Sequence, residues 1–258
     1  MNPFFLLPMS ATINASSTVV STNPAANVLV DDPGLTCRLD SASAGNIIFD
    51  FGTAVTLDTM ALLGTNLRAA DTVRLRAGTS AGNTTASPSW DSTALAAWSG
   101  SKTANRSKVV RTFPPHSARY WRIDIGATAH PDAFLEITRA AFGAHVESPS
   151  PLPPRAAQFL MDPSIIEEAE GWETVDERDV LPGWRVPFEW ITDAQWRDTW
   201  WPFLLRAKLS KRVLFVPFPD EADWLQDSAV FGRIRSHENA HPVHDGWQCE
   251  ITIISNGL

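Results

Sequence analysis

Two tryptophans in one polar loop are the residues best suited to contact a ligand. Trp90 and Trp98 lie within residues 80–107, a stretch rich in Ser, Thr, Ala and Asn. An indole ring offers a flat apolar face on which a sugar ring can stack. We therefore predict glycan stacking by Trp90 and Trp98; the alternative is that both rings pack beneath the loop or against a neighbouring subunit. Asp91 is the only acidic residue of this stretch, so we expect no calcium site there.

A possible nucleophile and a pair of carboxylates do not predict an enzyme. Gly78-Thr79-Ser80-Ala81-Gly82 matches the G-x-S-x-G elbow, but that elbow needs a helix directly after the turn. Residues 83–88, Asn-Thr-Thr-Ala-Ser-Pro, do not predict one, so the glycines indicate a turn. The acidic stretch 167–177 could supply carboxylates for acid–base catalysis, but no partner group accompanies it. A solvated charged face or loop is the better interpretation, and we expect no catalytic residues.

Three histidines are the only hint of a metal. His237, His241 and His244 lie close together, but Pro242 excludes helical spacing, no cysteine is nearby, and Glu238 and Asp245 are the only local carboxylates. A His-rich hairpin loop is therefore favoured over a zinc site, and we expect neither a metal nor a cofactor.

Composition excludes several classes of protein. The 258 residues carry a net charge of −8 and no basic run, which argues against sequence-specific nucleic-acid binding. No apolar run approaches the ~20 residues of a membrane span. Residues 1–9 are apolar but contain two prolines and no basic group, so they indicate an N-terminal strand or arm and not a signal peptide. Cys37 and Cys249 make no disulfide framework, and we expect buried free thiols.

The proline-rich segment 148–154 divides the chain into two parts of different character. Four of its seven residues are proline, which predicts a polyproline-like spacer. Residues 1–150 carry 11 basic and 11 acidic groups, whereas residues 151–258 carry 10 and 18, and eight of the 11 tryptophans follow the segment. We predict one domain over 1–147, a linker over 148–154 and a second domain over 155–258; the alternative is a surface loop within one domain.

The first part reads as an antiparallel β-sandwich. Short alternating or apolar segments are separated by polar turns, without a strong helix, which is typical of a sandwich or jelly roll. The predicted strands are 46–52, 59–64, 72–78, 108–113, 119–125 and 134–143.

The second part reads as a small α+β domain. Thr192 and Gln195 form a capping box, and Trp196 and Trp200 share a face of the helix that follows. Pro202 must kink or restart this helix. The strands expected to form a sheet beside it are 155–161, 184–191, 212–218, 229–235 and 246–254.

The tryptophan content of this second domain predicts self-association. Eight tryptophans in about 100 residues exceed what so small a core readily encloses, and leftover apolar surface marks an interface. The strand that contains Pro187 should lie at an edge or leave that position unpaired. A closed ring would cover both features. We assign the subunit interface to Trp184, Pro187, Trp196, Trp200 and Trp201.

The acidic balance suggests what such a ring would enclose. An acidic lumen repels phosphate groups, so that a polyanion could pass through it without binding. We assign Glu167, Glu168, Glu170 and Glu173 to part of the lumen lining.

The first domain resembles the discoidin, or coagulation-factor type C, module. The resemblance rests on the order of strand motifs Asn46–Gly52, Met60–Leu67, Ala118–Ile125 and Glu136–Gly143, together with the early strand-and-turn Asn27–Asp32. It implies a galactose-binding-like jelly roll over about residues 15–145, with a possible carbohydrate site on loops at one end. These motifs are structural, so they identify a fold and not a ligand.

The second domain resembles the ring-forming β domain of tailed-bacteriophage tail proteins. The resemblance rests on the sequence of a strand, the capped helix, and the strands Val213–Pro217, Val230–Ile234 and Trp247–Ile254. It implies a virion structural protein of the distal tail, in the tail tip or baseplate, made in the host cytoplasm. It also implies a homo-oligomeric ring, a hexamer or alternatively a trimer, joined to the tail tube, hub and fibres. The alternative function is a host-surface glycan-binding adhesin or a secreted carbohydrate-binding protein.

Overall fold

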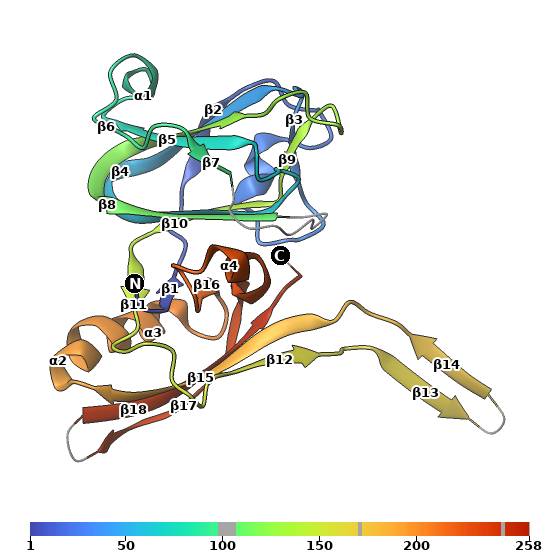
Figure 1. Ribbon diagram of the computed structural model, residues 1–258, viewed down its shortest axis with the longest axis vertical. Coiled ribbons are helices and arrows are strands. Elements are labelled where there is room, and N and C mark those ends of the chain that lie inside the picture. The colour runs from blue at the N-terminus through green and yellow to red at the C-terminus, as the bar shows by residue number, and fades with distance from the viewer. Residues whose placement is uncertain (98–106, 170–171, 244–245, 258) are drawn as a thin grey trace. The chain divides into compact units, whose positions relative to one another are not determined.

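The computed structural model is mainly β and describes residues 1–97, 107–169, 172–243 and 246–257. It divides into two compact units (Figure 1). The sandwich unit comprises Leu6–His145 and Asp220–Asp227. The sheet unit comprises Met1–Phe5, Val146–Pro219 and Ser228–Leu258. The antiparallel sandwich and the α+β unit expected from the sequence are both confirmed.

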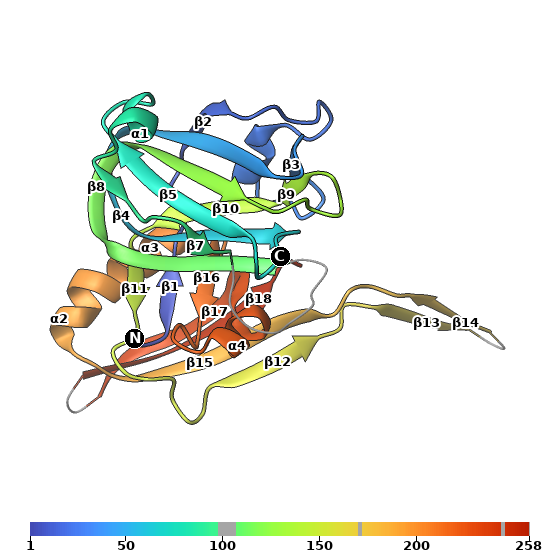
Figure 2. The ribbon, with the colours of Figure 1, turned by 45° about the horizontal axis from the view of Figure 1, so that its top comes forward.

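Two long bent strands organise the sandwich unit. β4 (Ala44–Thr65) and β8 (Ser107–Gly126) pair with each other along most of their length, and each curves from one layer of the sandwich into the other (Figures 1 and 2). The sequence predicted four separate strands here. The turn signals at Gly52 and at Pro114-Pro115 instead mark bends within continuous strands.

The bends coincide with irregularities in the β4–β8 ladder. The register shifts between Asp50 and Val55, where Gly52 has a φ of 78° that favours glycine. It shifts again between Leu57 and Thr59, opposite Pro114 and Pro115. Proline has no amide hydrogen to donate, so it is tolerated where the ladder is already interrupted. These residues therefore bend the sheet instead of ending its strands.

Shorter strands complete the sandwich. The sheet order is β10-β4-β8-β5-β6, with β2 on β4 and β7 on β5, and β3 pairs separately with β9. The remaining elements are β2 (Thr12–Ser16), the 3₁₀ helix η1 (Ala25–Leu29), β3 (Cys37–Leu39), β5 (Thr72–Gly78), α1 (Asn83–Ala86), β6 (Trp90–Asp91), β7 (Leu95–Ala96), β9 (Leu135–Ile137), β10 (Arg139–Gly143) and α4 (Ala222–Ser228). The core between the layers includes Phe49, Trp121 and Phe142, all fully or almost fully buried.

The sheet unit is built on an antiparallel sheet that takes in the start of the chain. In the part of the chain that the structure describes, its order is β11-β1-β16-β17-β18-β15-β12. The strands are β1 (Phe4–Leu6), β11 (His145–Glu147), β12 (Ala157–Met161), β15 (Leu181–Ile191), β16 (Arg212–Val216), β17 (Val230–Val243) and β18 (Gly246–Ser255). The sequence indicated an N-terminal strand but placed it in the first domain, because nothing in residues 1–9 identifies the partner strand.

The boundary between the units therefore differs from the one expected at residues 148–154. The chain passes between units at Phe5–Leu6 and at His145–Val146, and again on either side of Asp220–Asp227, which groups with the sandwich unit. Ser148 donates its backbone N–H to the Pro3 carbonyl at 2.7 Å, which ties the proline-rich segment to β1 within the sheet unit. That segment connects β11 at one edge of the sheet to β12 at the other. Its prolines lack donors, so it can run between the edges without joining the ladder.

The main helix spans Asp193–Ala207 and keeps its expected start. The Thr192 hydroxyl accepts from the Gln195 backbone N–H at 3.2 Å, while the Gln195 side chain accepts from the Thr192 backbone N–H, so the capping box is confirmed. The helix runs as α2 (Asp193–Gln195), the π-helical turn η2 (Trp196–Trp200) and α3 (Trp201–Ala207). Pro202 cannot donate a helical hydrogen bond, and the wider π turn directly before it accommodates that loss.

A bulge near the end of β15 changes which side chains face the core. The β15–β18 register shifts between Phe188 and Ile191, and Trp190 adopts a φ of 62°. Strict alternation along the predicted strand 184–191 would put Trp190 on one face with Trp184, Val186 and Phe188. Instead Ile191 is buried and Trp190 is 63% exposed, because the bulge reverses the alternation beyond Phe188.

A two-stranded hairpin leads away from the sheet of this unit. β13 (Ile165–Ala169) and β14 (Trp172–Asp176) pair with each other, in the register Ile166↔Val175, and form a separate sheet (Figures 1 and 2). The sequence predicted a solvated charged face or loop over residues 167–177, whereas the structure forms a hairpin there. None of the described helices is long and apolar enough to cross a membrane.

Phe5 holds the first strand in the sheet unit and should dominate its stability. Its fully buried ring contacts Phe188, Trp200, Phe203 and Phe215, with centroid distances from 4.6 to 5.9 Å. Phe5→Ala should lower the free energy of unfolding of this unit by about 3–5 kcal/mol. Urea unfolding followed by tryptophan fluorescence measures this.

Phe49→Ala is the matched control for this prediction. Phe49 is equally buried, but it packs on Phe142 within the sandwich unit. It should weaken the sandwich and leave the sheet unit's transition in place. If Phe5→Ala affects only the sandwich transition, then Phe5 is not a core residue of the sheet unit.

Candidate binding surfaces

Trp90 lies at the edge of the sandwich and packs against other rings. It begins β6, where Trp90 pairs with Ala77 of β5. Its ring lies 4.7 Å from Phe113, 6.0 Å from Trp121 and 6.1 Å from His116, measured between centroids. The indole is half-buried, so part of it packs on the core and part stays accessible; glycan stacking by Trp90 stays a prediction. Trp98 lies outside the described residues.

A small cavity beside Trp90 is too narrow for a sugar ring. Its volume is about 20 Å³, which is room for about one water molecule. The residues that line it are Met60, Val73, Leu75, Trp90, Ser92, Leu95, Arg111, Thr112 and Phe113. A glycan at this position would have to lie across the exposed part of Trp90 rather than enter the cavity.

Arg111 is a partly buried cation at the same cavity. Its guanidinium donates to the backbone carbonyls of Val110, at 3.0 Å, and Ala96. Burial lowers the pKa of Arg111 from its ordinary value. Within the described ranges, no carboxylate forms an ion pair with it. A guanidinium without a carboxylate partner can bind an anionic or strongly polar ligand group.

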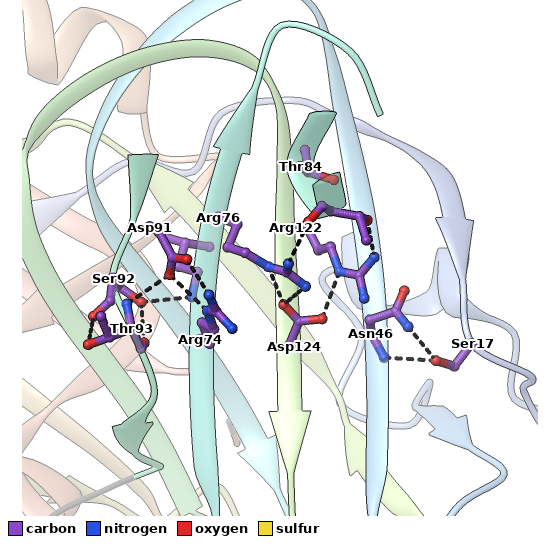
Figure 3. Close-up of polar contacts among 12 residues, drawn as sticks. Ser17, Asn46, Arg74, Arg76, Thr84, Asp91, Ser92, Thr93, Arg122 and Asp124 are labelled. Atoms are coloured by element: carbon purple, nitrogen blue, oxygen red, sulfur yellow. Dashed lines mark hydrogen bonds and ion pairs between the residues drawn. The ribbon is translucent and has the colours of Figure 1, made fainter. Parts of the chain in front are cut away.

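The outer face of the sandwich carries a ladder of ion pairs that positions β6 (Figure 3). Asp124 on β8 accepts from Arg76 Nε at 2.8 Å and from Arg122 Nε at 2.7 Å. Arg74 donates from Nε to Asp91 at 2.8 Å and makes a second contact to the same carboxylate. Hydrogen bonding to Arg74 lowers the pKa of Asp91. Since Asp91 follows Trp90, this pair fixes the strand that carries the tryptophan.

The same ladder extends to α1, and a separate hydrogen bond lies beside it on β4. Thr85 accepts from Arg122 Nη1 at its hydroxyl, at 2.6 Å, and from Arg76 Nη1 at its carbonyl. Asn46 donates its side-chain amide to the Ser17 hydroxyl at 2.8 Å. The sequence showed Arg74, Arg76, Arg122 and Asp124 as the exposed positions of alternating strands but not their partners. Only the β5–β8 register reveals which carboxylate meets which guanidinium.

Three of the five residues assigned to a subunit interface are buried within their own subunit. Trp184 donates its indole N–H to the Ser228 carbonyl at 2.8 Å. Trp196 stacks on Trp247 at 5.2 Å, and Trp200 packs on Phe188 at 4.8 Å. All three are less than 9% exposed. The sheet and its helix therefore enclose more indoles than the tryptophan count predicted.

The other two interface residues remain accessible. Trp201 is exposed on α3, whereas Phe203 and Leu204 of the same helix are buried. Pro187 pairs with Glu250 of β18, while β12 pairs only with Leu181–Arg185. Beyond Arg185 one side of β15 is therefore an edge among the described strands. An interface at Trp201 and Pro187 stays a prediction.

The acidic residues assigned to a lumen lie on the β13–β14 hairpin. Glu167 is exposed on β13. Glu168 and Glu173 occupy opposite positions of the two strands, and Glu170 lies outside the described residues. Their placement in a lumen stays a prediction.

Ser80 and the three histidines are the other residues that the sequence singled out for possible chemistry. A single helical turn, α1, does follow Ser80, contrary to expectation, but the exposed Ser80 hydroxyl accepts from the Asn83 backbone N–H, as turn residues do. His237 and His241 lie on β17, and His244 lies outside the described residues. Across the residues with assigned positions, no group of three or more His, Cys, Asp or Glu side chains could hold a metal ion.

Comparison with known proteins gives likenesses to solved structures only. No family model matches the chain, and no curated protein matches it. A CBM32 module from a family 31 glycoside hydrolase of Clostridium perfringens is similar at 16% identity, with a TM-score of 0.38, covering 53% of this chain and 95% of that one. The family 32 carbohydrate-binding module of C. perfringens NanJ, solved with galactose, is similar at 13% identity over 53% and 93%, also with a TM-score of 0.38.

A third likeness comes from a different class of protein. Reduced XRCC1 bound to the DNA polymerase β catalytic domain is similar at 16% identity, with a TM-score of 0.37, covering 55% of this chain and 99% of that one. Proteins with different partners thus resemble this chain to the same degree.

The two thiols should be inert in the native protein. Cys37 and Cys249 are buried and free, as expected. Burial, and then the charge of Glu136, raises the pKa of Cys37 to about 12; burial and Glu250 raise that of Cys249 to about 11. Because the thiolate is the reactive form, we expect no reaction with Ellman's reagent at pH 8 until urea is added, and then reaction of both thiols. Cys249→Ser should halve the number of thiols that react in urea. Rapid reaction of either thiol in the native protein would contradict the assignment of both as buried and inert.

Proposed function

We propose that this chain is a non-catalytic structural protein of the distal tail of a tailed bacteriophage, located in the tail tip or baseplate of the virion. In this proposal the sheet unit joins copies into a ring that connects the tail tube to the hub and fibres. The sandwich unit is displayed outward. The single observation that carries an assembly role is the exposed apolar hairpin of the sheet unit.

That hairpin exposes large apolar side chains of the kind that proteins usually bury. Ile166, Trp172 and Val175 are each exposed over more than half of their surface. Ile165 and Ile166 are both exposed, although adjacent residues of a strand face opposite sides, so both faces of the hairpin are open. An isolated two-stranded hairpin is marginally stable in water, and a partner that covers its apolar faces would stabilise it.

The connectivity also suits display of the sandwich. The main segment of the sandwich, Leu6–His145, leaves and rejoins the sheet unit at β1 and β11, which are neighbours in the sheet. An insertion whose two ends lie side by side can be carried without disturbing the host unit. The sheet unit can thus serve assembly while the sandwich serves another role.

The test of this proposal uses particles and purified protein together. Mass spectrometry of purified virions of the phage that encodes the chain should detect it, and a reconstruction of the tail tip should place it in a ring. Light scattering of the purified chain at rising concentration should approach the mass of six chains, with three as the alternative. Absence from the virion, or a monomeric copy in the tail tip, would refute the structural role.

Glycan binding by the sandwich is a second candidate function, and a specific observation favours it. Trp90 is half-exposed and lines the same small cavity as Arg111, whose guanidinium has no carboxylate partner among the described residues. An aromatic face beside a cation can recognise a sugar that bears a carboxylate or a dense set of hydroxyls. The ligand could be a glycan of the host surface. This candidate also covers an adhesin or a secreted carbohydrate-binding protein.

Paired substitutions at Trp90 test this candidate without emptying the core. Trp90→Phe keeps an aromatic face and the contact with Phe113, whereas Trp90→Leu keeps only apolar volume. We expect Trp90→Leu to reduce binding on a glycan array at least tenfold and Trp90→Phe to retain most of it. Thermal unfolding of both variants controls for loss of fold. If the intact chain binds no glycan, or if Trp90→Leu binds normally, Trp90 is not a stacking residue.

A further inference from the structure

The sheet unit carries two exposed apolar sets at separate places. The first is on residues 162–179, here called the arm, which contains β13 and β14. The second is on α3 and the turn after it, where Trp201, Leu205 and Leu209 are each exposed over at least half of their surface. Trp201 and Leu205 are four residues apart in one helix, so they share a face. We call these three side chains and the basic residues around them the helix patch.

The arm and the helix patch carry opposite charges. The arm has eight acidic residues and one basic residue. Residues 197–211 have one acidic residue, Asp198, and four exposed basic residues, Arg197, Arg206, Lys208 and Lys211. Within the described part of the chain, none of these four cations forms an ion pair. The patch therefore offers an apolar stripe with unneutralised positive charge beside it.

The arm of one chain is not placed on its own helix patch. β13 and β14 pair with each other, and both views show them leading away from the sheet, while α2 and α3 lie beside its other end (Figures 1 and 2). The partner that matches the arm in charge and in apolar character is the same patch on another molecule.

We propose that the arm of one copy docks on the helix patch of a second copy of this chain. The apolar side chains of the arm would cover Trp201, Leu205 and Leu209, and its carboxylates would neutralise the four cations. The contact joins two different surfaces, so it is heterologous and repeats from copy to copy until a ring closes. This inference deepens the proposed ring and rests on it, and it assigns the acidic residues to a subunit contact instead of a lumen.

Charge reversal on each surface gives a test with built-in complementation. The arm variant carries Asp162→Lys, Glu167→Lys, Asp176→Lys, Glu177→Lys and Asp179→Lys, which leaves the arm with three acidic and six basic residues. The helix variant carries Arg197→Glu, Arg206→Glu and Lys211→Glu. All eight side chains are exposed, so both variants should fold, which circular dichroism and thermal unfolding check. Each variant alone would oppose like charges across the contact, whereas an equimolar mixture would oppose unlike charges at every contact of an alternating ring.

Light scattering at matched concentration and low salt measures the mass of the assemblies. The wild-type chain should form oligomers, each variant alone should need at least tenfold higher concentration to do so, and the mixture should recover the wild-type mass. Added salt should weaken the wild-type and mixed assemblies, because it screens the charges. Folded variants that assemble as well as the wild type, or a mixture that does not recover, would overturn the docking proposal.

The outcomes separate this contact from the proposed function. A wild-type oligomer that the charge reversals do not affect refutes the arm contact and leaves a tail-ring role standing. Recovery in the mixture, together with absence of the chain from virions, supports the contact and refutes the tail role. A wild-type chain that stays monomeric at every concentration overturns the contact.

Discussion

The insertion of Phe5 into the aromatic core of the sheet unit is the contact on which the architecture depends. Phe5 stacks on Phe215 at 4.6 Å and meets Phe188 and Trp200 at 5.8 Å, so the fifth residue packs among residues near position 200. These contacts hold β1 beside β16 and β11. Closing so long a loop costs entropy, which the burial of a whole ring and its neighbours offsets. Without this strand the sheet would lose the element that brings the two ends of the sandwich together.

The sandwich can be regarded as an insertion between β1 and β11 of the sheet unit. Its own core is independent, since Phe49, Trp121 and Phe142 pack within it. The ion-pair ladder on its outer face then fixes β6 and hence Trp90 relative to β5. Asp124 is central to that ladder because one carboxylate neutralises two guanidinium groups, and both arginines are mostly buried. The surface beside Trp90 is thus rigidly positioned, although its cavity is small.

Sequence reasoning predicted the parts of the structure that depend on local pattern. The capping box at Thr192 and Gln195, the alternation of residues 119–125 and the fold class of both units follow from side-chain period and cap chemistry. It was wrong where distant segments decide. Gly52 and the prolines at 114–115 read as strand ends because the pairing that carries β4 and β8 through them is not local.

The tryptophans of the sheet unit show the same limit. Counting indoles predicted an apolar surplus, but the count cannot show that Trp196 and Trp247 cover each other or that Trp200 fills the space beside Phe5. Nor could period-2 alternation place Trp190, since one bulge with a positive φ reverses it. The exposed apolar residues therefore differ from those that the count selected, and they lie on the arm and on α3.

The distribution of charge, more than its total, bears on the lumen hypothesis. Residues 151–258 contain 18 acidic and 10 basic residues, and the arm accounts for eight and one of them. The rest of that part of the chain is then close to neutral, with ten acidic and nine basic residues. A pore that repels DNA along its whole surface requires acidic groups spread over the elements that line it. An excess concentrated on one exposed hairpin, opposite in sign to the surroundings of α3, instead fits a contact that selects its partner by charge.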